Sequence, residues 1–315
     1  MTVAVDLRGC EFQDEVELKY SEFAQTVDLS GSTFRRSLNS GDETESHTIY
    51  RKDLICNGAI FEGPVGFNGC RIEGSAYFSE TTFANAFERA DFGAASIGKT
   101  LECQGSTFKG PVSFAALSCG GTGFFTGCKF QGEGPVLFSS ATFGNNLVCD
   151  DASFAGRVDL ERLECGGGAV FRRTRFEGEG DVNFVQASIG GNIECQNATF
   201  EGQAIFNSVT CRLGGFFTMA AFEGPAELGY ARFGGVFDCP GALFAGWTNF
   251  DSLECASLDC NDAIFNGPTN FNMLPGLVSS PDLGRQPSIG AQSPPPGRCT
   301  RGRKARQTTR MPTAA

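Results

Sequence analysis

The sequence is poor in the residue types that most often carry catalysis or cross a membrane. Its 315 residues include one His, one Trp, four Tyr and four Met. The single histidine, His47, leaves no second imidazole for a catalytic pair, and it lies in a polar segment. No apolar run approaches the roughly 18 residues that a membrane helix needs. The first ten residues have neither a basic start nor an apolar stretch, so we expect no signal peptide and a cytoplasmic, reducing location.

Charge is also scarce, whereas phenylalanine, glycine and cysteine are abundant. Charged residues make up 19% of the chain, below the quarter that is usual in globular proteins. Hydrophobic residues, at 41%, are numerous enough to bury a core, which excludes intrinsic disorder for most of the chain. The 42 Gly are too many for a coiled coil. The 31 Phe therefore need a structural explanation.

Phenylalanine recurs with a fixed period. From Cys195 to Cys255 the apolar residues alternate spacings of five and six, so four steps make a repeat of 22 residues. One column of this register, the Phe column, has a small residue two positions before most of its members. Its twelve members are Phe12, Phe34, Phe61, Phe83, Phe108, Phe130, Phe154, Phe176, Phe200, Phe222, Phe244 and Phe265. Extra residues collect at one corner after this column, for example between Phe83 and Phe92, as insertions do in repeat proteins.

The local pattern predicts very short strands. A helix would show apolar spacings of three and four, whereas this chain repeats two inward positions, i−2 and i, followed by a corner. Ala152-Ser-Phe154 and Ala198-Thr-Phe200 are examples. Such units give four short faces per coil, and stacked coils then pair as parallel strands. We predict that the Phe column forms the structural core, including Phe61, Phe83, Phe108, Phe130, Phe154, Phe176, Phe200, Phe222, Phe244 and Phe265.

The motif of a small residue, any residue, Phe, any residue and Gly on a five-residue beat resembles the pentapeptide-repeat family. The resemblance covers about residues 5–271. It implies an all-β fold, a right-handed quadrilateral parallel β-helix (solenoid) of about twelve coils. The chain departs from the family motif in its alternating six-residue step, and it is most similar to the Phe- and Gly-rich variant. We predict a β-helix over residues 1–274.

The cysteines fit the same register. Ten of the 14 Cys follow a large apolar residue at i−2, whereas a Phe at an equivalent position follows a small one, so each strand is expected to bury one large and one small side chain. One column reads Cys103, Phe125, Cys149, Phe171, Cys195, Phe217, Cys239. Cysteines two coils apart are beyond disulfide reach. The chain has no CxxC motif, and we predict packing roles for the cysteines, no metal site and no cofactor, with Cys255 and Cys260 as the least regular pair.

Two segments leave the register. Residues 35–49 are predicted to form an acidic loop, more simply explained as a solvated excursion than as a partner-binding loop. Residues 275–315 are predicted to form a disordered, basic, Pro-rich tail. This tail holds seven basic residues and one acid, and residues 1–274 hold 18 bases and 35 acids, so the repeat body has a net charge of −17. Contact of the tail with nucleic acid or an anionic membrane, and an inert or non-native terminus, both stay open.

One outward column is a candidate interaction surface. It occupies the position before each Cys or Phe of the alternating column. Its apolar members in alternate coils are Tyr77, Phe124, Val170 and Phe216. The coils between them carry Glu102, Val148, Glu194 and Asp238. Exposed apolar groups in a row often mark a partner site, and the alternative is that the aromatic rings stabilise the sheet by stacking with neighbours.

These patterns point away from catalysis. The acids are scattered singly along outer positions, so we predict no enzyme and no small-molecule substrate. We predict a non-catalytic protein-interaction scaffold with an unidentified protein partner. An apolar solenoid end near Phe271 also suggests a homodimer through that end.

The family resemblance implies an alternative function, DNA mimicry. Some pentapeptide-repeat proteins are acidic rods that bind DNA gyrase and topoisomerase IV and protect them from quinolones. The repeat body here carries about one net charge per 3 Å of predicted rod, against about one per 1.7 Å of duplex DNA. We expect no direct nucleic-acid binding by this acidic body.

Overall fold

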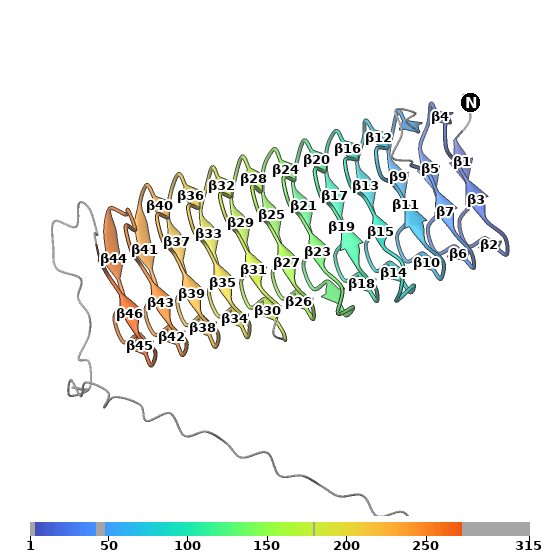
Figure 1. Cartoon of the computed structure of the whole chain (residues 1–315). Coiled ribbons are helices and arrows are strands. Elements are labelled where there is room, and N and C mark those ends of the chain that lie inside the picture. Colours follow the sequence, from blue (N-terminus) through green and yellow to red (C-terminus); the bar gives the residue numbers. More distant parts are fainter. Residues whose placement is uncertain (1–3, 42–47, 179, 273–315) are drawn as a thin grey trace, which may run out of the picture. The chain divides into compact units, whose positions relative to one another are not determined.

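The computed structural model describes residues 4–41, 48–178 and 180–272. This part of the chain forms 46 short strands and no helix, and the strands stack coil upon coil from β1 to β46 (Figure 1). No helix among these residues is therefore available to cross a membrane. The coils contribute their strands to four parallel sheets, here named A to D, and the last two coils add no strand to sheet D. The predicted parallel β-solenoid of about twelve coils is confirmed.

Sheets A and B each contain twelve strands, and nearly all of these are two residues long. Sheet A consists of β1 (Val5–Asp6), β5 (Val27–Asp28), β9 (Leu54–Ile55), β13 (Ala76–Tyr77), β17 (Leu101–Glu102), β21 (Gly123–Phe124), β25 (Leu147–Val148), β29 (Ala169–Val170), β33 (Ile193–Glu194), β37 (Gly215–Phe216), β41 (Val236–Asp238) and β44 (Ser257–Asp259). Sheet B consists of β2 (Glu11–Phe12), β6 (Thr33–Phe34), β10 (Ile60–Phe61), β14 (Thr82–Phe83), β18 (Thr107–Phe108), β22 (Lys129–Phe130), β26 (Ser153–Phe154), β30 (Arg175–Phe176), β34 (Thr199–Phe200), β38 (Ala221–Phe222), β42 (Leu243–Phe244) and β45 (Ile264–Phe265).

Sheet C also has twelve strands, and sheet D has ten. Sheet C consists of β3 (Val16–Glu17), β7 (Leu38–Asn39), β11 (Val65–Gly66), β15 (Ala90–Asp91), β19 (Val112–Ser113), β23 (Val136–Leu137), β27 (Val158–Asp159), β31 (Val182–Asn183), β35 (Ala204–Ile205), β39 (Ala226–Glu227), β43 (Thr248–Asn249) and β46 (Thr269–Asn270). Sheet D consists of β4 (Glu22–Phe23), β8 (Ile49–Tyr50), β12 (Arg71–Ile72), β16 (Ser96–Ile97), β20 (Ser118–Cys119), β24 (Thr142–Phe143), β28 (Glu164–Cys165), β32 (Ser188–Ile189), β36 (Thr210–Cys211) and β40 (Arg232–Phe233).

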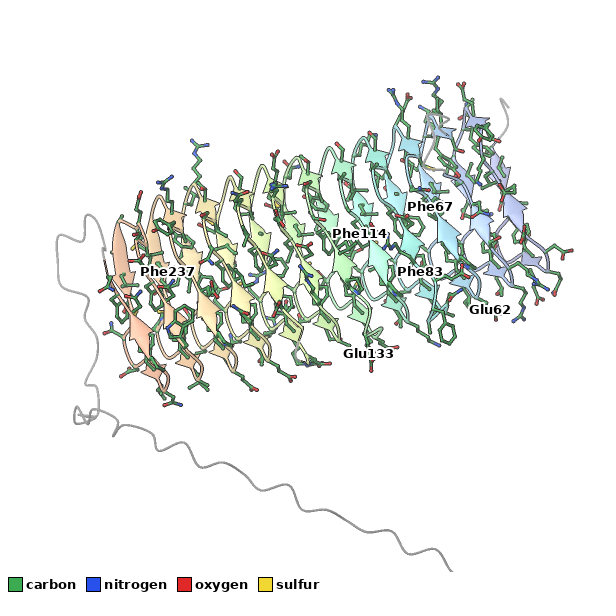
Figure 2. The ribbon with its side chains drawn as sticks, in the orientation of Figure 1. Glu62, Phe67, Phe83, Phe114, Glu133 and Phe237 are labelled. Carbon is green, nitrogen blue, oxygen red and sulfur yellow. The ribbon has the colours of Figure 1, made fainter. Side chains whose placement is uncertain are left out.

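The Phe column lies inside sheet B, and its rings stack directly on one another. The rings of Phe83 and Phe108 have centroids 4.4 Å apart and an interplanar angle of 4°, and β14 pairs with β18 so that these two residues are in register. Of the ten predicted core Phe, nine are buried, and Phe265 in the last coil is half-buried. Stacked parallel rings fill the axis of the coil and add attraction beyond the area they remove from water. Figure 2 shows Phe67, Phe83 and Phe114 enclosed by the ribbon.

The small positions of each strand leave space for large neighbours in the next coil. A Cβ added at Gly123 would lie 2.3 Å from Cε1 of Phe143, so only glycine fits beside this ring. Gly215 stands in the same relation to Phe233, with 2.6 Å to Cε1. The predicted pairing of one small and one large inward side chain is present in both strands, because Gly123 and Phe125, like Gly215 and Phe217, are buried.

Insertions collect at the corner between sheets B and C. Most coils need only three residues between the two strands, as between Phe61 and Val65. Longer corners follow β14, β22 and β30, where the next strand of sheet C begins at Ala90, Val136 and Val182. Figure 2 shows Glu133, from one of these corners, at the same edge of the solenoid as Glu62. The extra residues leave the register of the sheets unchanged.

The loop predicted over residues 35–49 is wrong in its extent. Strand β7 lies within this range and pairs with both β3 and β11, and β8 begins at Ile49. The chain therefore stays in register through Leu38–Asn39, because the step from Phe34 to Leu38 is the ordinary corner between sheets B and C. Residues 42–47, with His47, and the tail of residues 275–315 lie outside the described residues.

The cysteines line the interior. Of the 13 described Cys, all are unbonded thiols and 11 are buried, while Cys10 and Cys255 are half-buried. Burial raises the pKa of Cys165 and of Cys211 to about 12, because the thiolate would lose its hydration. Thiols held in the neutral form inside a core are chemically inert under ordinary conditions, as expected for packing residues.

Candidate interaction surface on sheet A

The predicted outward residues form one continuous ladder on sheet A. In-register pairing places each member beside the equivalent member of the coils above and below. The ladder consists of Asp6, Asp28, Ile55, Tyr77, Glu102, Phe124, Val148, Val170, Glu194, Phe216, Asp238 and Asp259. Its six apolar members are all half-buried, and its two ends are acidic. The structure thus brings together the eight residues of the outward column that the sequence pattern named, and it adds Ile55, Asp6, Asp28 and Asp259 to them.

Aromatic side chains distinguish this face from the other three. Among the described strands, outward aromatic residues occur only on sheet A, as Tyr77, Phe124 and Phe216. The outward positions of sheet D are mainly Ser, Thr, Arg and Glu, and those of sheet C are mainly polar apart from Leu137 and Ile205. Tyrosine and phenylalanine provide large contact areas with few rotatable bonds, which favours binding at an exposed face.

The three rings do not stack on one another. Glu102 separates Tyr77 from Phe124, and Glu194 and Asp238 flank Phe216. None of the ring pairs among the described residues includes these three rings, whereas the interior rings pair repeatedly. The ring of Phe216 instead lies close to Gly214, where an added Cβ would come within 3.1 Å of it. Each of the three outer rings therefore has at least one acidic neighbour in the ladder, and Tyr77 and Phe124 also have Ile55 and Val148 beside them.

The acidic members of the ladder differ in their partners. Glu194 lies 3.9 Å from the guanidinium of Arg172. Asp238 accepts a hydrogen bond from the hydroxyl of Thr218 at 3.3 Å and is in register with Asp259. Burial raises the pKa of Asp238, and the adjacent Asp259 carboxylate adds to this rise. Two carboxylates side by side and away from a cation favour a basic partner group.

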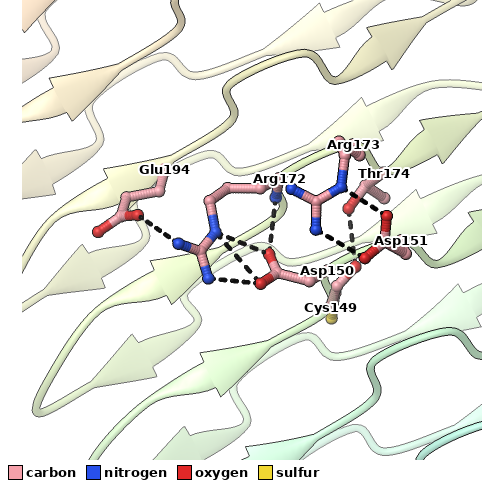
Figure 3. Close-up of polar contacts among 7 residues, drawn as sticks. All are labelled: Cys149, Asp150, Asp151, Arg172, Arg173, Thr174 and Glu194. Carbon is pink, nitrogen blue, oxygen red and sulfur yellow. Dashed lines mark hydrogen bonds and ion pairs between the residues drawn. The ribbon is translucent and has the colours of Figure 1, made fainter.

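A cluster of ion pairs borders the ladder at the corner after sheet A (Figure 3). Arg172 lies 2.6 Å from Asp150, which is largely buried, and Arg173 lies 2.7 Å from Asp151. The hydroxyl of Thr174 donates a hydrogen bond to the carbonyl oxygen of Cys149 at 2.7 Å. Each contact joins two neighbouring coils, so the cluster ties the coils together and neutralises its own charges. It leaves no general acid or base free for catalysis.

The part of the chain that the structure describes also contains no cluster of side chains suited to bind a metal ion. Within residues 4–41, 48–178 and 180–272, no three His, Cys, Asp or Glu side chains are grouped to hold an ion. The buried thiols are separated by bulky residues in most coils, and the surface acids are distributed over four faces.

The structure also reveals exposed groups that the sequence pattern did not identify. Phe87, in the long corner after β14, is 93% exposed. A groove of about 520 Å³ beside this corner is lined by Arg35, Arg36, Glu15, Glu88 and four neutral residues. Arg35 already bridges Glu11 and Glu62, so part of the groove's charge is neutralised. The inserted corner carried no periodic signal from which this exposure could be predicted.

Both ends of the described solenoid are less buried than its middle. In the first coil, Val5, Leu7 and Phe12 are half-buried, although equivalent residues further along are fully enclosed. In the last coil, Phe265 and Phe271 are half-buried. The homodimer through a solenoid end stays a prediction.

The comparisons with known proteins bear on the repeat alone. Residues 67–116 match a family model described as pentapeptide repeats, with nine copies. No curated protein and no solved structure matches the chain. The matched segment runs from the corner after β11 to the corner after β19, and the same four-sheet register continues on both sides of it.

Proposed function

We propose that this chain, a pentapeptide-repeat protein, is a non-catalytic scaffold that binds a partner protein along the outer face of sheet A. One observation carries this proposal. Outward aromatic side chains among the described strands are confined to sheet A, where they form one ladder with aliphatic and acidic residues. A rigid solenoid fixes the spacing of such a ladder, so a partner meets a preformed surface at little entropic cost.

Stacking within the sheet is the weaker explanation for the outer rings. A ring that stabilises its own sheet is expected to pair with another aromatic or β-branched residue opposite it. Tyr77 lies between Ile55 and Glu102, Phe124 lies between Glu102 and Val148, and Phe216 has an acid on both sides. Each ring therefore has at least one charged neighbour, which offers it little apolar contact and leaves apolar surface available to a partner.

The charges of the ladder indicate the chemistry of the partner. Its central part is apolar, and acids lie within it and at both ends, at Asp6, Asp28, Asp238 and Asp259. A matching partner surface presents apolar side chains bordered by Lys or Arg. Because part of the attraction is electrostatic, binding is expected to weaken as salt concentration rises.

DNA mimicry is the second candidate, and the charge of the last coils favours it. Residues 201–272 hold eight acids and two bases, whereas residues 101–147 hold two of each. Basic DNA-binding surfaces would be attracted to these last coils. Over about three coils of 4.8 Å, six net charges remain less dense than those of duplex DNA.

Site-specific photocrosslinking tests the proposal directly. A benzophenone amino acid is placed at Phe124 or Phe216 on sheet A, and at Leu137 or Ile205 on sheet C as matched controls. The controls are also half-buried, outward and apolar. In cells that make the protein, we expect the same protein adduct from both sheet A positions and not from sheet C.

Substitution and enzyme assays separate the outcomes. When the benzophenone amino acid is placed at Tyr77 instead, Phe124→Ser with Phe216→Ser is expected to abolish the adduct. The unfolding midpoint of this variant should stay close to that of Leu137→Ser with Ile205→Ser. Equal adducts on both sheets, or none on sheet A, would contradict the assignment of this face. Inhibition of purified gyrase supercoiling that survives the double sheet A change would favour DNA mimicry instead.

A further inference from the structure

From Cys56 to Cys239 the inward column behind sheet A alternates large and small side chains from coil to coil. Cys195 lies in register with Phe217 in the next coil, and Phe217 lies in register with Cys239. A bulky ring thus separates successive thiols, which places most cysteines of this column two coils apart. The alternation lets large side chains of one coil pack beside small ones of the next.

The last coil breaks this alternation because it is one residue shorter. Strand β41 pairs with β44 so that Phe237 faces Leu258 and Asp238 faces Asp259. The backbone N–H of Cys239 donates to the carbonyl oxygen of Asp259 at 2.8 Å. In these two successive coils a large inward residue is followed two positions later by an inward cysteine. Cys239 and Cys260 therefore face each other without an intervening ring.

The two thiols are in contact. Their Sγ atoms are 3.2 Å apart, and this is the one sulfur–sulfur hydrogen bond among the described residues. Neighbouring strands of a parallel sheet lie about 4.8 Å apart, which falls inside the range of roughly 4.4–6.8 Å between the Cα atoms of a disulfide. Bond formation requires the sulfurs to approach by about 1 Å, with no change of strand register.

We propose that Cys239 and Cys260 are an oxidation site that forms a disulfide between the last two coils. The reaction is thiol–disulfide exchange with a small-molecule disulfide. One thiolate attacks that disulfide and displaces the first reduced thiol, and the second cysteine then attacks the mixed disulfide and displaces the other. Two protein thiols are oxidised, one external disulfide is reduced to two thiols, and the two protons from the protein thiols pass through solvent to the two leaving thiolates.

The surroundings of the pair make oxidation depend on opening of the last coil. Cys239 is completely buried and Cys260 is 2% exposed. The hydrogen bond with Cys260, together with burial, raises the pKa of Cys239, so its thiolate is rare in the closed state. The last coil has half-buried Phe265 and Phe271 and only an isolated bridge, between Arg232 and Glu254, on its sheet D side. Local opening there exposes Cys260, and the bond then locks this coil to the preceding one.

Peptide mapping of the full chain tests the pairing. The protein is incubated with oxidised glutathione, its free thiols are blocked, and it is digested by a protease that cleaves before Asp. Cleavage before Asp238, Asp251, Asp259 and Asp262 places Cys239, Cys255 and Cys260 in three separate fragments. We expect a reducible link between fragments 238–250 and 259–261. A link from fragment 251–258 to either of them, or no link in the folded protein, would overturn the proposal.

Matched variants add a second readout. Oxidation is expected to raise the unfolding temperature of the parent protein and of Cys255→Ala, and dithiothreitol should reverse the shift. The same treatment should leave Cys260→Ala and Cys239→Ala unchanged, each compared with its own reduced form. Cys195→Ala serves as a control for loss of a buried thiol, because Cys195 lies in register with Phe217 rather than with another cysteine. A shift that persists in Cys260→Ala would contradict the proposed pair.

Discussion

The first coils and the last coils share one core but have different exteriors. Near the N-terminal end, Arg51 lies 2.8 Å from Glu22 and 2.7 Å from Glu73, so one cation ties three coils together. Arg35 bridges Glu11 and Glu62 in the same way. In residues 201–272, eight acids accompany two bases, and Arg232 with Glu254 forms the single ion pair found among the described residues there.

Exposed apolar side chains follow the same division. Six large apolar residues are exposed over the last coils, namely Leu213, Met219, Tyr230, Val236, Trp247 and Ile264. The described residues up to Phe87 have three, Tyr20, Ile60 and Phe87, and those between Phe87 and Leu213 have none. The first coils pair several of their acids with arginine, whereas the acids of the last coils, apart from Glu254, have no ion pair among the described residues and lie beside exposed apolar groups. Such a combination is typical of a surface that meets another molecule.

The largest expected effect tests whether the two regions truly share a core. Phe61→Ala and Phe222→Ala each remove a buried ring that stacks on both neighbours. Both changes should destabilise the protein by a similar amount, about 3–5 kcal/mol, since each leaves a cavity in a packed column. Urea unfolding followed by fluorescence or circular dichroism measures this. A clear difference between the two losses in the free energy of unfolding would mean that the cores are unequal.

The two ends should be less sensitive than these interior positions. Phe12 and Phe265 belong to the same column but are half-buried, because each has a stacked ring on one side only. Phe12→Ala and Phe265→Ala should each cost roughly half of the interior value, since less apolar area is lost and water fills the space. An interior-sized loss for either one in the same urea titration would indicate that a partner copy covers that end.

A smaller effect on the unfolding midpoint should distinguish the exterior of the first coils from that of the last coils. Arg51→Gln removes a cation that holds two carboxylates, whereas Arg232→Gln removes one exposed ion pair. The first change should lower the unfolding midpoint slightly more than the second, and the difference should vanish at high salt because exposed charges are screened. Equal midpoints at low salt would show that the second carboxylate held by Arg51 adds nothing to stability.

The smallest effect concerns pH, and its sign should differ between the two regions. Hydrogen bonds from Arg8 lower the pKa of Asp6 to about 2, and those from Arg35 and Arg51 lower the pKa values of Glu11 and Glu22. A lowered carboxyl pKa stabilises the fold above the unfolded value near 4, and this contribution is lost as pH falls through the folded pKa.

Asp238 has the opposite sign, because burial raises its pKa and protonation then relieves its repulsion with Asp259. As pH falls from about 6 to 3, amide exchange should become faster in the first coils relative to the last coils. Hydrogen exchange with mass spectrometry resolves the two regions. Parallel changes in both regions would contradict this assignment of the charges.

Much of the solenoid could be predicted from one column of phenylalanines. The 22-residue period predicts the number of coils, the positions of the corners and the pairing of large with small side chains. It does so because nearly every inward position holds an apolar or small residue. Strand β7 was missed, since Leu38 belongs to no Phe motif and the polar residues after it suggested a loop. The positions of the outer ladder were also predictable, because a residue between two inward positions must point outward.

Other features depend on contacts that no single column contains. The thiols of Cys239 and Cys260 face each other because the last coil is one residue shorter, which places both cysteines at equivalent inward positions. The sequence pattern instead suggested Cys255 and Cys260 as the irregular pair. The ion pairs of Arg172 and Arg173 depend on side-chain reach between coils, and the exposure of Phe87 depends on the path of an inserted corner.

The corner between sheets B and C has a consequence for changing this protein deliberately. Three times in the central coils the chain adds residues there, and the strands on either side keep their register. The other corners of the solenoid keep a constant length in those coils. Peptides grafted after Phe83, Phe130 and Phe176 would therefore be displayed along one edge, at intervals of about two coils or roughly 10 Å, on a support that does not need redesign.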